Sequence, residues 1–182
     1  YNLVRIPFEV FTSFSMKSAT NIWLTVITER PDLAHVILSD VIFCWKESII
    51  SKKGLFDREH DLLPEDYQMM EYAPYDKVKI DRDARIASST FEPHRHIIKF
   101  FSSHFAGTQH QSDHLLNLFT TCFIYGVQEF SKASLHPFAR LIRNEYLLFG
   151  ISILRANVRR NTNTVSSLCR LIINAGLEWF RK

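Results

Sequence analysis

Five of the eight histidines lie close together in the sequence, and histidine is the residue type best suited to bind a metal or transfer a proton at neutral pH. They are His94, His96, His104, His110 and His114. His110 and His114 have the spacing of four residues that lets two imidazoles on one helix chelate a metal. However, Ser112 is a typical N-cap that leaves His110 outside the helix, and no Glu is placed as a general base. We therefore predict no metal site and no catalytic residue in this cluster.

Other patterns that would bind a nucleotide or support catalysis are missing from the sequence. The five glycines are scattered singly, whereas a phosphate loop needs clustered glycines so that backbone N–H groups can approach the ligand. There is no G-x-S-x-G, H-E-x-x-H or C-x-x-C motif. Cys44, Cys122 and Cys169 lie far apart within apolar patterns, which favours buried, reduced thiols in a cytosolic setting. We expect this segment to bind no cofactor.

Charge is divided unevenly along the chain, although the net charge is only +3. Residues 57–85 hold nine of the nineteen acidic residues and five basic ones, whereas residues 131–182 hold nine basic residues and only two acidic ones. A basic stretch can bind anionic lipid, nucleic acid or an acidic partner. Arginines spread over two helices more often form a solvated surface or pair with an acidic loop.

The candidate interaction residues come from both of these regions. Tyr72 and Tyr75 lie in the string MEYAPYD, which is too apolar for a simple linker and is expected to dock on the helices. The basic candidates are Arg140, Arg143, Arg155, Arg159 and Arg160.

Hydrophobic periodicity predicts an all-α protein. A chain of 182 residues that is 46% hydrophobic can bury one substantial core, and its few glycines and prolines favour long helices. Apolar residues recur at intervals of three and four residues in six segments, as expected for helices. The six segments begin near Ala19, Pro31, Pro93, Ser112, Pro137 and Asn163. We predict a helical hairpin over about residues 14–53, a charged insertion over about 54–92 and a stack of four helices over about 93–182.

The segment that begins at Pro137 is apolar on two sides and must therefore lie between neighbouring helices. We predict an α-solenoid or an irregular stack of antiparallel helical pairs, with a compact irregular bundle as the alternative because no fixed repeat period is visible. No apolar run reaches the length of about 20 residues that a bilayer span needs. The chain opens at Tyr1 without Met, and its last helical pattern continues to Lys182 without a stop signal. We therefore expect a segment of a longer polypeptide.

Six short strings follow one another in an order and spacing that resemble one family. They are IPFEVF, NIW, KKGLF, MEYAPYD, PHRHIIKFFSSHF and ASLHPFARLIRNEYLLFGISIL. Together they resemble the fungal branch of the type III alpha phosphatidylinositol 4-kinases, over nearly the whole chain, in the helical region N-terminal to the kinase core. The resemblance implies a parent enzyme that uses ATP and Mg to phosphorylate phosphatidylinositol at the cytosolic face of the plasma membrane. No catalytic residue carries over, because the kinase motifs D-R-H and D-F-G are absent and Asp81-Arg82-Asp83 departs from the first.

The same resemblance implies a structural role for the segment. It would be a helical scaffold that contacts the kinase core of the same chain, contributes to homodimer contacts and links the enzyme to adaptor and membrane-anchored scaffold proteins. Membrane association would then be peripheral, through the complex. The alternative function is a helical-repeat module that binds nucleic acid or an acidic partner through its Arg-rich C-terminal half. Most aromatic residues lie on core stripes rather than on a basic face, which disfavours nucleic acid.

Overall fold

The computed structural model describes residues 2–57, 90–107, 112–132, 137–158 and 162–181. These residues form seven α-helices and two short 3-10 helices, with no β-strand among them, so the all-α prediction is confirmed. The α-helices are α1 (Asn2–Val10), α2 (Ser13–Glu29), α3 (Ala34–Ile50), α6 (Glu92–Gly107), α7 (Asp113–Phe130), α8 (Pro137–Asn157) and α9 (Thr162–Arg181). The 3-10 helices are η1 (Pro31–Leu33) and η2 (Gly54–Phe56).

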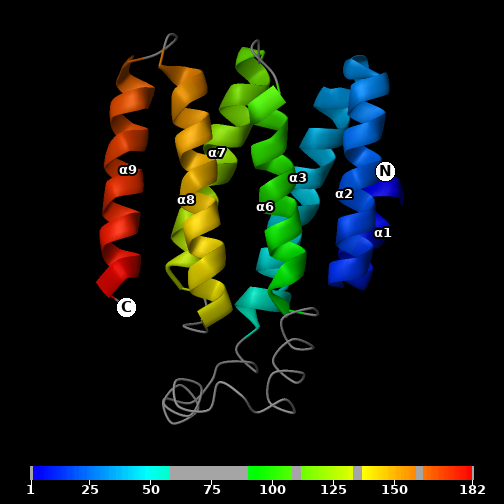
Figure 1. The fold of residues 1–182 in the computed structure, drawn as a ribbon, viewed down its shortest axis with the longest axis horizontal. Helices are drawn as coiled ribbons and strands as arrows, with labels where there is room; N and C mark the ends of the chain where they lie inside the picture. Colours follow the sequence, from blue (N-terminus) through cyan, green and yellow to red (C-terminus); the bar gives the residue numbers. More distant parts are fainter. Residues whose placement is uncertain (1, 58–89, 108–111, 133–136, 159–161, 182) are drawn as a thin grey trace.

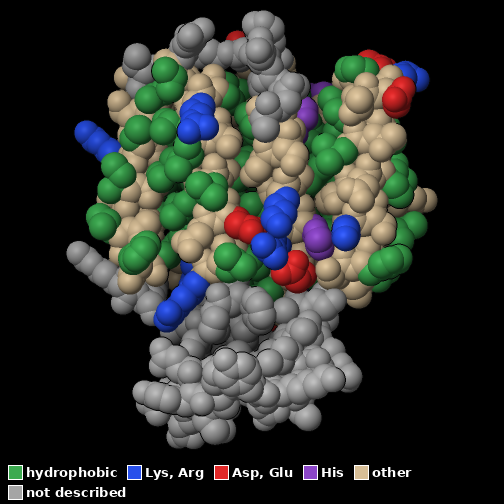
Figure 2. Space-filling view, viewed as in Figure 1, with side chains coloured by type: hydrophobic (Ala, Val, Ile, Leu, Met, Phe, Trp, Pro, Cys, Tyr) green, Lys and Arg blue, Asp and Glu red, His purple; other side chains and the backbone are tan. Residues whose placement is uncertain are grey.

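The helices run side by side in two layers and alternate in direction along the chain (Figure 1). α2, α6 and α8 form one layer and pack on one another in that order, while α1, α3 and α7 lie behind them. Figure 2 shows the surface of this front layer from the same side. α9 packs on α8 at one end of the stack, and α1 packs on α2 and α3 at the other. The arrangement is therefore a stack of antiparallel helical pairs, as predicted.

Local sequence signals explain where four of the described helices begin. The side chain of Ser112 accepts a hydrogen bond from the Leu115 amide, which confirms its predicted role as the N-cap of α7. Thr12 and Ser15 form a reciprocal capping box at the start of α2. Proline opens both η1 and α8, where its missing N–H costs no helical hydrogen bond.

Helix α1 is absent from the six predicted helices. Pro7 lies inside it and has no N–H to donate to the carbonyl of Leu3, one turn earlier. The indole Nε1 of Trp23 in α2 donates to that carbonyl instead, at 3.3 Å. A tertiary contact therefore replaces the backbone hydrogen bond that proline removes, which a purely local pattern does not reveal.

One aromatic core runs through the stack from its first helix to its last. Ring contacts with centroid separations of 4.7–6.3 Å connect α1 to α9 through α2, α6, α8 and α7 in turn. Such separations are typical of favourable aromatic pairs. The path is Phe8, Trp23, Phe100, Phe101, Phe149, Tyr146, Phe130 and Trp179. Trp45 of α3 meets this path at Phe101, with ring centroids 6.0 Å apart, so all seven α-helices in the described part of the chain share one hydrophobic core.

Candidate functional site

His94 forms the centre of a buried junction between α3 and α6. The indole Nε1 of Trp45 lies 3.2 Å from Nδ1 of His94, and because an indole N–H can only donate, Nδ1 must be the acceptor. Nε2 of His94 therefore carries the proton and donates to the backbone oxygen of Lys53 at 3.0 Å. Complete burial lowers the pKa of His94 to about 4, although the hydrogen bond to Lys53 opposes this shift. The imidazole is neutral and structural.

The surroundings of His94 are aromatic on two sides and closed by a glycine on the third. The rings of Phe11 and Phe56 meet the imidazole edge to face, with centroids at 4.9 and 5.2 Å. Gly54 has a φ of 62°, and a Cβ atom there would lie only 2.2 Å from the backbone oxygen of Thr90. Glycine is therefore required at position 54, where the chain just after α3 passes close to the backbone just before α6.

Lys53 connects this junction to α1. Its Nζ atom donates to the backbone oxygens of Phe8 at 2.8 Å and Glu9 at 3.4 Å, which are carbonyls of the last turn of α1. A cation at a helix C-terminus satisfies otherwise unpaired carbonyls and interacts favourably with the helix dipole. Phe8, Lys53 and His94 belong to IPFEVF, KKGLF and PHRHIIKFFSSHF, so three strings that carried the family resemblance meet in space at this junction.

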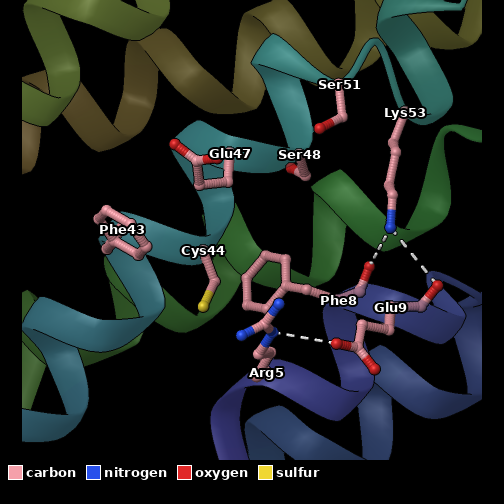
Figure 3. Close-up of a pocket in the computed structure, with 9 residues that line it drawn as sticks. All are labelled: Arg5, Phe8, Glu9, Phe43, Cys44, Glu47, Ser48, Ser51 and Lys53. Carbon is pink, nitrogen blue, oxygen red and sulfur yellow. Dashed lines mark hydrogen bonds and ion pairs between the residues drawn. The ribbon is translucent and has the colours of Figure 1, made fainter. Parts of the chain in front are cut away.

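A surface cavity of about 360 Å³ lies beside the junction, between α1 and α3 (Figure 3). Arg5 and Glu9 form an ion pair of 3.0 Å on its α1 side, while Phe43 and Glu47 line its α3 side. Cys44 also lines it, but the thiol is buried and its pKa is raised, first by burial and then by nearby carboxylates. A raised pKa keeps the thiol protonated and makes it a poor nucleophile.

The histidines that are adjacent in the sequence separate in the structure. His96 lies 3.0 Å from the hydroxyl of Ser13, His104 stacks on Phe119 in the core, and His114 contacts His35 on α3. His110 lies outside the described residues. In the described ranges, no three His, Cys, Asp or Glu side chains are grouped so that they could hold a metal ion.

The prediction of buried, reduced thiols is confirmed for two of the three cysteines. Cys44 and Cys122 are buried, free thiols, and burial raises the pKa of Cys122 to about 12. Cys169 on α9 is also a free thiol, but it is only half-buried.

Only some of the arginines predicted to form an interaction surface are exposed in the structure. Arg140 and Arg155 are exposed on α8, whereas Arg143 is 2% exposed, so its assignment to an interaction surface is wrong. Its Nε and Nη2 atoms donate to the backbone oxygen of Phe130, at 3.0 and 2.9 Å, and thereby cap the end of α7. Arg159, Arg160, Tyr72 and Tyr75, with most of the acidic insertion, lie outside the described residues.

Both ends of the stack expose apolar side chains. On α9, Ile173, Leu177 and Phe180 are 59%, 55% and 89% exposed and form one stripe at helical spacing. They lie away from Leu168 and Trp179, which are buried against the rest of the core. Leu148 on α8 is also exposed, so the predicted second apolar side of that helix is only partly covered.

The opposite end of the stack has a corresponding apolar surface. Leu3 and Ile6 of α1, with Ile22 of α2, line an open groove of about 230 Å³. All three side chains are about half exposed. Apolar stripes on both end helices are what an internal part of a longer helical stack would present, because its neighbouring layers are missing.

The layered fold, the structural junction and the two apolar ends define this chain as a helical scaffold segment. The chain belongs to the family described as the PI4-kinase N-terminal region, whose model matches residues 2–182. It is 53% identical over its whole length to phosphatidylinositol 4-kinase STT4 of Saccharomyces cerevisiae, and 23% identical over 98% of its length to phosphatidylinositol 4-kinase stt4 of Schizosaccharomyces pombe. In both cases the chain spans 10% of the relative's length. No solved structure matches it. The family resemblance inferred from the sequence is thereby confirmed.

Proposed function

We propose that this chain is a non-catalytic scaffold segment of a phosphatidylinositol 4-kinase. The complete polypeptide would transfer the γ-phosphate of ATP, with Mg²⁺, to phosphatidylinositol at the cytosolic face of the plasma membrane. Family membership supports this proposal, as does the fact that both relatives are named phosphatidylinositol 4-kinases. Because the chain spans only 10% of those relatives, the phosphotransfer site would lie elsewhere in the polypeptide.

The apolar stripe on α9 is the observation that carries the scaffold role. A helix that exposes Ile173, Leu177 and Phe180 on one side while burying Leu168 on another is suited to lie between two layers. Burying three large apolar side chains contributes roughly 1.5–3 kcal/mol each, so a covering layer would add substantially to stability. The apolar groove between α1 and α2 supports the scaffold role in the same way at the other end of the stack.

Contacts with the kinase core, with a second copy of the enzyme and with adaptor and membrane-anchored scaffold proteins belong to the same proposal. Peripheral attachment to the plasma membrane would then depend on the complex. In keeping with this, none of the helices in the described part of the chain is long and apolar enough to cross a bilayer.

A direct assay tests whether the complete polypeptide phosphorylates the lipid while this chain alone does not. The complete polypeptide and this 182-residue chain are each incubated with phosphatidylinositol vesicles, Mg²⁺ and radiolabelled ATP. We expect labelled phosphatidylinositol 4-phosphate from the complete polypeptide only, and no saturable ATP binding by the 182-residue chain. Lipid phosphorylation by the isolated chain would refute the non-catalytic role, and a complete polypeptide inactive on this lipid would refute the parent activity.

A further inference from the structure

Helix α3 carries an exposed apolar stripe that differs from the stripes at the two ends of the stack. Val36, Phe43 and Ile50 are 54%, 54% and 63% exposed, and they recur at intervals of seven residues. Seven residues are nearly two helical turns, so the three side chains form one line of about 21 Å along the helix. The opposite side of α3, which includes Leu38, Val41 and Trp45, is completely buried.

The position of α3 argues against coverage by the next layer of the same stack. α3 lies in the rear layer between α1 and α7, and it contacts both of them (Figure 1). Further layers of a helical stack are added at its ends, beyond α1 or α9. The solvent side of α3 belongs instead to a broad side of the stack.

Charged residues border the apolar stripe with opposite signs on its two sides. Asp40 and Glu47 are seven residues apart on α3, and both act on the Cys44 thiol, which faces α1. Glu47 also lines the cavity with Glu9 and Arg5 (Figure 3). Lys46 lies on the other side, with its Nζ atom 5.3 Å from the centre of the Tyr125 ring on α7. An occupant would therefore meet carboxylates along one edge of α3 and a cation along the other.

The cavity beside Phe43 is lined by two acidic and two basic residues, and contacts within the chain engage both cations. Arg5 is paired with Glu9 at 3.0 Å, and the ammonium group of Lys53 is engaged by the carbonyls at the end of α1. Asp40, Glu47 and Glu9 each disfavour ionisation of the Cys44 thiol on the cavity wall, and only Arg5 opposes them. Because both lining cations are engaged by these contacts, a basic side chain that entered the cavity would be attracted to the carboxylate of Glu47.

We propose that the solvent face of α3 binds one amphipathic helix of a partner protein. The partner helix would carry apolar residues at intervals of seven, packed along Val36, Phe43 and Ile50, and Lys or Arg residues on the edge that meets Asp40 and Glu47. This is the side-by-side packing of coiled coils, in which flanking charges select the partner and its orientation. The inference rests on the scaffold role proposed above, since it identifies a surface through which the scaffold would hold another protein.

Photo-crosslinking in the complete polypeptide tests this assignment. Phe43 is replaced by the photoreactive amino acid benzoylphenylalanine in cells that express the complete chain, and crosslinked peptides are sequenced. The same replacement of Ser103, an exposed residue of α6, serves as the control. We expect the probe at position 43 to capture one segment of another protein with the seven-residue apolar repeat and the basic edge. The proposal is wrong if position 43 captures only this polypeptide, a segment without that pattern, or no more than position 103 captures.

Charge reversal provides a second test in the same chain. With the probe at position 43, D40K together with E47K should lower the crosslinked fraction about tenfold, because like charges would then face each other. R170E on α9 is the matched control and should leave the yield unchanged. An equal yield from the D40K/E47K chain would overturn the proposed orientation of the partner. Lipid phosphorylation by the unmodified polypeptide is measured separately, so that a failure of the parent activity is distinguished from a failure of this surface.

Discussion

Arg143 donates from both Nε and Nη2 to the backbone oxygen of Phe130, at 3.0 and 2.9 Å, across the interface between α8 and α7. Its guanidinium also lies 6.0 Å from the centre of the Trp179 ring on α9. One buried cation therefore holds three consecutive helices together at one end of the stack.

Replacing Arg143 should destabilise the fold, although its side chain carries a charge. R143M leaves the buried Phe130 carbonyl without these donors, and we expect a loss of about 2–3 kcal/mol in the free energy of unfolding. R170M, at an exposed position of α9, should change it by less than about 0.5 kcal/mol. Urea denaturation followed by circular dichroism measures both values, and equal effects of the two variants would contradict the capping role.

Acidification should destabilise the chain through His94. The pKa of His94 is about 4 in the folded state, below the ordinary value of 6.5, so between these values the unfolded state binds a proton that the folded state does not. Stability is therefore fully present above pH 6.5 and falls as the pH drops towards 4, by up to about 3 kcal/mol.

The variant H94Q separates this effect from general acid denaturation. Gln cannot titrate, so the variant should be less stable at pH 7 but lose less additional stability between pH 6.5 and 4. H114Q, at an exposed histidine, is the control and should follow the parent chain. Urea midpoints are measured for each chain at several pH values. An identical dependence of the midpoint on pH for H94Q and the parent would argue against a neutral, buried His94.

Two glycine substitutions should have opposite effects on stability. G54A places a methyl group at positive φ and against the Thr90 carbonyl, and it should cost at least about 2 kcal/mol. G176A lies within α9 with its nearest neighbour, Leu147 Cδ1, at 3.7 Å, and it should stabilise the chain by about 0.5–1 kcal/mol. Thermal unfolding of both variants tests the pair. A tolerated G54A would show that the junction around His94 adapts more readily than its geometry indicates.

Removing the Lys53 ammonium should loosen α1 selectively. K53M deletes the donor to the Phe8 and Glu9 carbonyls, and hydrogen exchange of the α1 amides should accelerate about tenfold. The neighbouring K52M removes an exposed charge and should have no such effect. Exchange in α9 serves as an internal reference, and uniform acceleration in both helices would mean that Lys53 contributes to global stability rather than to a local cap.

The predictable part of the fold is the part encoded by local signals. Ser112 could be assigned as an N-cap because its side chain bonds to a backbone group three residues away. Regular apolar spacing extends over 16 residues or more in helices α2, α3 and α6–α9, so this periodicity alone was sufficient to predict them. α1 has only nine residues with Pro7 in its interior, and its missing hydrogen bond is replaced by Trp23.

The candidate site depended on contacts between distant segments, which the sequence pattern does not display. Arg143 resembles its exposed neighbour Arg140 in sequence, and only the position of the Phe130 carbonyl explains why it is buried. Likewise, His94 belongs to a cluster in the sequence, but its partners Trp45 and Lys53 are more than 40 residues away. Charge and residue type indicated candidates, whereas tertiary packing decided their roles.

Cysteine labelling of the complete polypeptide tests the central claim that this segment is an internal layer of a larger scaffold. I173C places a thiol on the apolar stripe of α9, and N174C places one on the adjacent exposed position of the same helix. If a further layer covers the stripe, maleimide should label the I173C chain much more slowly than the N174C chain, and unfolding in urea should equalise the rates. Equally fast labelling of both folded chains would mean that α9 ends the stack, and would contradict the claim.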